Sequence, residues 1–89
     1  MSDEDIRSRF GCRLRELRKE KRLSQEQLAY QAGIDRTYVS SCERGARNIS
    51  LVNIGKLADA LGVETSELLR PPEECSAERE TGRSEEDHD

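Results

Sequence analysis

The stretch that decides the fold is "SQEQLAYQAGIDRTYVSSCERG", residues 24–45. Its first four residues form a capping box, in which the Ser24 hydroxyl accepts from the Gln27 amide and the Gln27 side chain reaches back. Gly33, in the middle, is the residue type that ends helices in the left-handed conformation. Asp35 then suits the N-cap of a second helix, which a further glycine closes. The stretch therefore predicts two short helices joined by a tight turn.

The spacing of small and branched residues within this stretch indicates how the two helices pack. Ala29 lies four residues before Gly33 and is small enough to let the helices cross closely. Val39 lies six residues after Gly33 and fills the space between them, with Cys42 on the same face. These offsets are typical of a helix-turn-helix. The alternative is a structural hairpin of two helices.

Three further helices are predicted around this pair. Apolar side chains at helical spacing predict a first helix over residues 5–22. A fourth helix is expected between the Ser50 cap and Gly62, and a short fifth helix begins at Thr65 and ends before the proline pair. The sequence thus predicts an all-α fold of five short helices.

Charge divides the chain into two parts. Residues 1–70 hold 13 basic and 11 acidic side chains, whereas residues 71–89 hold eight carboxylates and two arginines, and the formal net charge is -4. We therefore expect a compact, mildly basic domain over residues 1–70. The acidic tail over residues 71–89 is expected to be disordered.

Several classes of function do not fit this composition. No apolar run approaches the roughly 20 residues of a membrane helix, and the polar N-terminus is unlike a signal peptide, so a cytoplasmic location is expected. The spacing of Cys12, Cys42 and Cys75 fits no zinc pattern, which predicts three free thiols, with Cys42 as a small buried residue. Residues 1–70 contain no histidine to activate a nucleophile, so we expect no catalytic residue, metal or cofactor.

The outward face of the second helix of the motif carries the candidate DNA-binding residues. With Val39 and Cys42 inward, polar side chains are expected to point outward, and the N-terminal part of such a helix reaches base edges in the major groove. Arginine can bond guanine O6 and N7, threonine can contact a thymine methyl group, and short serines let the helix enter the groove. The predicted base contacts are Arg36, Thr37, Tyr38 and Ser41. The alternative for each is a solvated helix surface.

Candidate phosphate contacts lie on either side of this helix. Gln25 begins the first helix of the motif, where amide groups and the helix dipole favour an anion. Arg44, Arg47 and Asn48 lie at the end of the second helix and in the turn that follows. For Arg47 and Asn48 the alternative is an ordinary polar turn.

The segment "LSQEQLAYQAGIDRTYVSSCERGARNISLVNIGKLADALGV", residues 23–63, resembles the lambda-repressor-like, Cro/C1-type (XRE) helix-turn-helix family. Within that family, "DRTYVS" followed by "ERGARN" is similar to the controller proteins of restriction–modification systems. The resemblance extends over about residues 6–69 and implies a lambda-repressor-like, five-helix DNA-binding domain. It also implies a buried ion pair between Arg18 and Glu43 that ties the first helix to the third. The phosphate contacts that it implies are Gln25, Ser40, Arg47 and Asn48.

These observations predict a sequence-specific transcriptional regulator whose partner is double-stranded DNA. The resemblance implies a homodimer on an inverted repeat, with the two recognition helices about 34 Å apart. Val63, Leu68 and Leu69 are candidates for the dimer interface, and their alternative is plain core packing. The competing function is an antitoxin or protein-bridging module of the same fold, for which the acidic tail favours a basic protein partner.

Overall fold

The computed structural model describes residues 2–73, which form five helices and no strand. The helices are α1 (Asp3–Glu20), α2 (Gln25–Ala32), α3 (Arg36–Glu43), α4 (Leu51–Leu61) and α5 (Thr65–Leu68). The prediction of an all-α, five-helix fold is confirmed over these residues. The tail was predicted to be disordered, and its residues from 74 onward lie outside the described part of the chain.

Serine side chains begin three of the five helices. The Ser24 hydroxyl accepts from the Gln27 amide at 3.0 Å, and Gln27 Oε1 accepts from the Ser24 amide at 2.8 Å, so the predicted capping box is confirmed. The Ser50 hydroxyl accepts from the Asn53 amide at 3.1 Å and so caps α4. Ser2 caps α1, which therefore begins at residue 3 and not at residue 5 as predicted. Asp35 has the extended backbone of an N-cap but makes no side-chain cap hydrogen bond to α3.

Two glycines end helices as the sequence predicts. Gly33 after α2 and Gly62 after α4 have φ angles of 74° and 72°, in the left-handed region. The residue after each glycine donates its amide back into the helix, from Ile34 to Ala29 and from Val63 to Ala58, both at 3.0 Å. These hydrogen bonds satisfy terminal carbonyl groups and turn the chain sharply.

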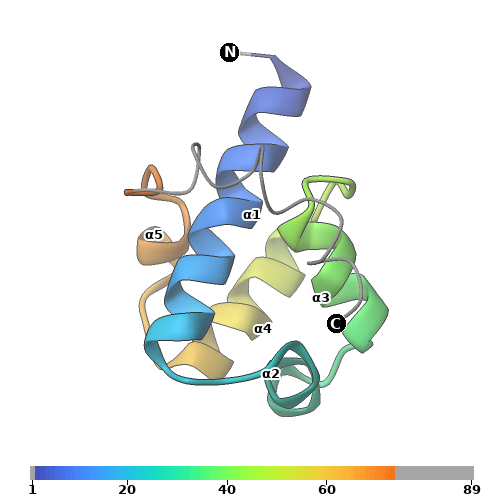
Figure 1. The fold of residues 1–89 in the computed structure, drawn as a ribbon, viewed down its shortest axis with the longest axis vertical. Helices are drawn as coiled ribbons and strands as arrows, with labels where there is room; N and C mark the ends of the chain where they lie inside the picture. The colour runs from blue at the N-terminus through green and yellow to red at the C-terminus, as the bar shows by residue number, and fades with distance from the viewer. Residues whose placement is uncertain (1, 74–89) are drawn as a thin grey trace.

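The core is aliphatic and draws on all five helices. Figure 1 shows α1 running through the molecule, with α3 on one side of it and α5 on the other. Burial of apolar side chains from each helix stabilises the fold, because helices this short are marginal alone. The buried cluster is Phe10, Leu14, Leu17, Leu28, Ala29, Val39, Cys42, Ile54, Leu57, Ala58, Leu61 and Leu68.

Gly11 allows α1 and α3 to approach each other closely. A Cβ atom at this position would lie 2.6 Å from the Glu43 carbonyl oxygen and closer still to that of Cys42. Such distances are shorter than real Cβ contacts, so no larger residue fits unless the helices separate. Gly11 therefore sets where the C-terminal end of α3 sits on α1.

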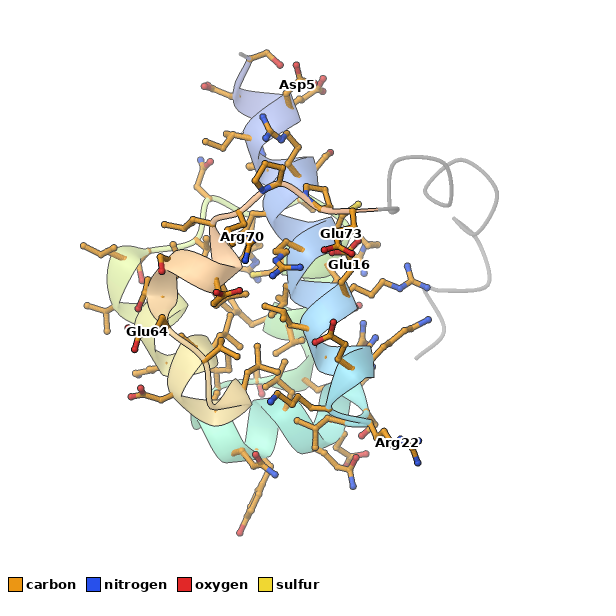
Figure 2. The ribbon with its side chains drawn as sticks, turned by 90° about the vertical axis from the view of Figure 1, so that its left-hand side faces the viewer. Asp5, Glu16, Arg22, Glu64, Arg70 and Glu73 are labelled. Carbon is orange, nitrogen blue, oxygen red and sulfur yellow. The ribbon has the colours of Figure 1, made fainter. Side chains whose placement is uncertain are left out.

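Arg13 fastens α5 to α1. Its Nε donates to the Glu67 carbonyl oxygen at 2.8 Å, and its Nη2 donates to Glu67 Oε1 at 3.1 Å. Beyond α5, the chain returns across α1, where the Glu73 amide donates to Glu16 Oε2 at 2.8 Å. Figure 2 shows Glu73 beside Glu16 on this face.

The cysteines differ from one another. Cys12 is disulfide-bonded, so the prediction of three free thiols is wrong for this residue. Cys42 is a free and buried cysteine of the core, as expected. Cys75 lies outside the described residues.

None of the helices within residues 2–73 has both the length and the apolar character needed to cross a membrane.

Candidate nucleic-acid interface

The α2–turn–α3 unit packs around a small group of buried residues. Ala29 is 3% exposed and Val39 is fully buried, and both belong to the core. The left-handed Gly33 between the helices sets the angle of the turn. The arrangement leaves the outer side of α3 on the surface of the molecule.

A buried ion pair joins α3 to α1. Arg18 Nε donates to Glu43 Oε2 at 2.6 Å and its Nη2 donates to Glu43 Oε1 at 3.1 Å. Arg18 Nη1 donates to the Leu23 carbonyl oxygen at 2.8 Å, so the guanidinium also holds the loop before α2. The two side chains are 7% and 4% exposed. This is the pair that the family resemblance implies, and it fixes α3 against α1 with charge-assisted hydrogen bonds.

Gln25 belongs to this buried network. Its Nε2 donates to Glu43 Oε1 at 2.9 Å, and the residue is only 5% exposed. Its Oε1 is buried and accepts no hydrogen bond from the described residues. The side chain is thus turned inward, because Glu43 accepts a hydrogen bond from its amide group, and the phosphate contact of Gln25 stays a prediction.

A shallow hollow of about 390 Å³ opens between α2 and α3. Its lining consists of Arg18, Ser24, Gln25, Glu26 and Arg36. The first amides of a helix have no partners within it and give this end a partial positive charge. The hollow therefore combines two arginines and one glutamate with the N-terminal end of an eight-residue helix.

Fewer side chains of α3 are exposed on its outer surface than the sequence predicts. Thr37 is exposed, and Arg36, Tyr38 and Ser41 are half-buried. Ser40, which was expected to point outward, is only 7% exposed, and its hydroxyl accepts from Arg44 Nη1 at 2.8 Å. The expectation is wrong because contacts on both sides of this short helix leave few positions open, and the Arg44 side chain covers Ser40.

Arg44 is itself exposed, and it keeps a second contact to α3. Its Nη2 lies 3.5 Å from the Ser41 hydroxyl oxygen, at the long end of the hydrogen-bonding range. The predicted base contact Ser41 and the predicted phosphate contact Arg44 are therefore neighbours on one surface.

The turn after α3 presents two exposed polar residues, Arg47 and Asn48. The Arg47 guanidinium lies over the Tyr38 ring, 4.8 Å from its centroid. Asn48 Oδ1 accepts from Arg7 Nη1 at 3.1 Å, and the Gly45 carbonyl oxygen accepts from Arg7 Nε at 3.3 Å. Arg7 of α1 thus holds this turn in place.

The sequence prediction omitted two residues that shape this surface, Arg7 and Asn53. Asn53 Nδ2 donates to the Tyr38 hydroxyl oxygen at 3.0 Å. Asn53 is a polar residue within the otherwise apolar first turn of α4, which is a signal that it contacts something polar. Arg7 has no such signal, since it is one of several arginines on α1.

The thiol of Cys42 has a raised pKa. Burial raises it from 9.0 to about 11, while Arg47 lowers it and Glu43 raises it through their charges. The thiol is therefore neutral near pH 7 and acts as a packing residue beside the ion pair.

The predicted dimer-interface residues differ in accessibility. Leu68 is fully buried in the core and has no surface to offer a second chain, so it packs as the alternative supposed. Val63 is half-buried against the core. Leu69 is 57% exposed, and the other exposed aliphatic residues are Ile6, Leu51 and Val52.

Comparison with known proteins gives three kinds of match. A family model described as helix-turn-helix matches residues 14–68. Control protein C.MunI from a Mycoplasma species is 56% identical over 66 residues, which cover 73% of this chain and 89% of that protein. The crystal structure of the restriction-modification controller protein C.AhdI from Aeromonas hydrophila has a TM-score of 0.69 and 61% identity, and the match covers 70% of this chain and 94% of that one.

More distant structures include controller protein C.Esp1396I with substitutions. Separate variants replace an arginine, a threonine and a tyrosine at three consecutive positions. The arginine variant is 31% identical to this chain, with a TM-score of 0.67, and the match covers 72% of this chain and 89% of that one. The chain therefore belongs to the Cro/C1-type (XRE) helix-turn-helix family that its sequence resembles.

Proposed function

We propose that this protein is a sequence-specific transcriptional regulator that binds an inverted-repeat operator as a homodimer, through the major groove. The observation that carries this proposal is the position of α3. Its inner side is fixed by Val39 and by the Arg18–Glu43 ion pair, while Thr37 is exposed on its outer side. A short helix held this firmly at the surface suits insertion into a groove.

Base reading is assigned to the first turn of α3. Arg36, Thr37 and Tyr38 are consecutive, and arginine, threonine and tyrosine in this order are the types replaced one at a time in the C.Esp1396I structures. A bidentate arginine–guanine contact discriminates against other bases by about 1–3 kcal/mol. Arg36 is therefore the residue whose loss should relax specificity most.

Phosphate contacts are assigned to both sides of α3. On one side, the backbone amides at the start of α2 replace the inward-turned Gln25 side chain as the donors. On the other side, Arg44, Arg47 and Asn48 are exposed. Contacts to DNA phosphates fix the register of the protein on the duplex without reading its sequence.

The dimer interface is assigned to the apolar surface beside α5. Ile6, Phe10 and Leu69 line two adjacent hollows of about 240 and 220 Å³, and the second extends to Ile54 of α4 and to the turn at Arg47 and Asn48. In Figure 1, α5 lies on the opposite side of α1 from α3. A second copy bound beside α5 would leave both copies of α3 uncovered.

Selection from a randomised pool of DNA duplexes tests the proposal. The wild-type chain should enrich an inverted repeat, and a duplex with both half-sites should bind more tightly than one with a single half-site. Binding that is equal for selected and random duplexes across a salt series would contradict sequence recognition, since phosphate contacts alone are salt-dependent and unselective.

A further inference from the structure

Asn53 holds the hydroxyl group of Tyr38 from outside the helix-turn-helix. Its Nδ2 donates to the Tyr38 oxygen at 3.0 Å, across the contact between α4 and α3. The backbone amide of Asn53 donates to the Ser50 hydroxyl at 3.1 Å, as part of the cap of α4. Both the main chain and the side chain of Asn53 therefore have defined partners.

The ring of Tyr38 is held by contacts from several parts of the molecule. One side packs against the core, and the Arg47 guanidinium lies 4.8 Å from the ring centroid. A cation over an aromatic face is an attractive arrangement. With Asn53 at the hydroxyl, the position of the ring is set by the core, by the turn after α3 and by α4.

The direction of the Asn53 hydrogen bond determines what the hydroxyl can do. An amide NH2 group only donates, whereas a tyrosine hydroxyl has one hydrogen to donate and lone pairs to accept with. Because the Tyr38 oxygen accepts from Asn53, its hydrogen is not used in this contact. The acceptors that DNA offers are phosphate oxygens and, in the major groove, guanine O6 and N7, adenine N7 and thymine O4.

We propose that Asn53 is a positioning residue that makes Tyr38 a hydrogen-bond donor toward DNA. The inference rests on the proposed DNA-binding function and adds to it a residue of α4 that lies outside the two helices of the motif. It follows that Asn53 affects DNA affinity only when the Tyr38 hydroxyl is present.

A double-mutant cycle tests this coupling. Dissociation constants are measured for the wild type, Tyr38→Phe, Asn53→Ala and the double variant, on the duplex that the wild-type chain selects. Loss of one hydrogen bond predicts roughly tenfold weaker binding for each single variant. The double variant should bind no more weakly than Tyr38→Phe alone.

A change in the direction of the hydrogen bond gives a second test. In Asn53→Asp the carboxylate accepts the Tyr38 hydroxyl hydrogen, so the donor is lost while the contact remains. Asp also adds repulsion from phosphate, and the same substitution in the Tyr38→Phe background measures that repulsion alone. The substitution should therefore cost more affinity in the wild-type background than in the Tyr38→Phe background.

The identity of the DNA acceptor follows from the same variants. If the hydroxyl donates to a phosphate oxygen, Tyr38→Phe weakens binding to random and selected duplexes alike. If it donates to a base, the loss appears on the selected duplex alone. Both results uphold the proposal, provided that the effect of Asn53→Ala follows the same pattern.

Independent losses in the double-mutant cycle would overturn the proposal, because Asn53 would then act by its own contact or by general stabilisation of α4. A lower melting temperature of the Asn53→Ala variant would identify general stabilisation of α4 as the explanation. Asp59→Asn, on the exposed side of the same helix, is the control that should keep wild-type affinity. Failure of the wild type itself to select a duplex would contradict the proposed function and not the coupling.

Discussion

Glu43 connects three parts of the protein through one side chain. It accepts hydrogen bonds from Arg18 on α1 and from Gln25 at the start of α2, while it belongs to α3. The carboxylate is almost fully buried, and only a charged partner with several hydrogen bonds makes such burial acceptable. The acidic residue in the middle of the recognition segment is therefore part of its support.

Glu43→Ala should destabilise the fold by about 3–5 kcal/mol, because it leaves the Arg18 charge buried without its partner. Chemical denaturation followed by circular dichroism measures the change in the free energy of unfolding. The paired substitution Arg18→Met with Glu43→Leu is the control, and it should recover part of the loss by replacing the ion pair with apolar contacts. A loss below about 1 kcal/mol for Glu43→Ala would show that the pair is solvated and contributes little.

The raised pKa of Cys42 predicts that the free energy of unfolding depends on pH in the alkaline range. The folded thiol has a pKa of about 11 against 9.0 for an unperturbed thiol, so the unfolded state loses this proton first. Between about pH 9 and 11 the unfolded chain holds fewer protons, and the free energy of unfolding should fall as pH rises, by on the order of 2 kcal/mol. Below about pH 9 the contribution is fully present. Denaturation curves over this range should show a shallower fall for Cys42→Ala, and equal slopes would contradict the burial effect.

At the residue scale, the sequence predicts types of residue better than their orientation. The polar pattern of residues 36–48 identified most of the surface beside α3, yet Gln25 and Ser40 turn inward. Both inward orientations have one cause, a neighbouring charged side chain that forms a hydrogen bond with the amide or hydroxyl group. Such contacts depend on distances between side chains and are not visible in spacing along the chain.

At the scale of elements, the predicted ends of α2 and α4 agree with the structure, whereas α1 extends over residues 3–20 and not 5–22 as predicted. The capping box at Ser24 and the glycines at 33 and 62 act through local hydrogen bonds and backbone conformation, so a short segment suffices to predict them. The crossing of α1 and α3 is different. Gly11 weakens a helix by about 1 kcal/mol relative to alanine, and only the structure shows that the space is occupied by the backbone of α3.

Gly11→Ala should destabilise the protein even though alanine favours helices. The new methyl group would meet the carbonyl oxygens of Cys42 and Glu43, and such overpacking costs about 1–3 kcal/mol. Operator affinity should fall as well, because α3 must move away from α1. Thermal unfolding and band-shift titration measure the two effects.

Gly55→Ala on α4 is the matched control for this substitution. A Cβ atom at Gly55 meets no other group within 4 Å, so the variant should be more stable by about 0.5–1 kcal/mol. Stabilisation by both substitutions would contradict the close approach of α1 and α3.

At the scale of the whole molecule, the exposed aliphatic residues explain how two chains could assemble. Ile6 and Leu69 are each 57% exposed and share the lining of the hollows beside α5. The sequence prediction of a dimer interface included the buried Leu68, because spacing cannot tell which side of so short a helix faces the core. Ile6 lies at helical spacing with Phe10 and Leu14, which predicts an inward position, and its exposure became evident only from the fold.

Leu69→Glu should produce monomers, since a carboxylate at the interface would lose its hydration on association. Sedimentation velocity over a range of concentrations measures the change in oligomeric state. Tyr30→Glu is the control, because Tyr30 is an exposed apolar residue of α2, away from the hollows beside α5. An unchanged distribution for Leu69→Glu would place the interface elsewhere on the molecule.

The central claim is that α3 reads base edges, and Arg36 is the residue that tests it most directly. Dissociation constants of the wild type and Arg36→Ala are measured at one salt concentration, on the selected duplex and on variants with each base pair changed in turn. We expect Arg36→Ala to lose about 1–3 kcal/mol on the selected duplex and to stop discriminating at one position of each half-site. A uniform loss on all duplexes, with discrimination retained at every position, would contradict the claim.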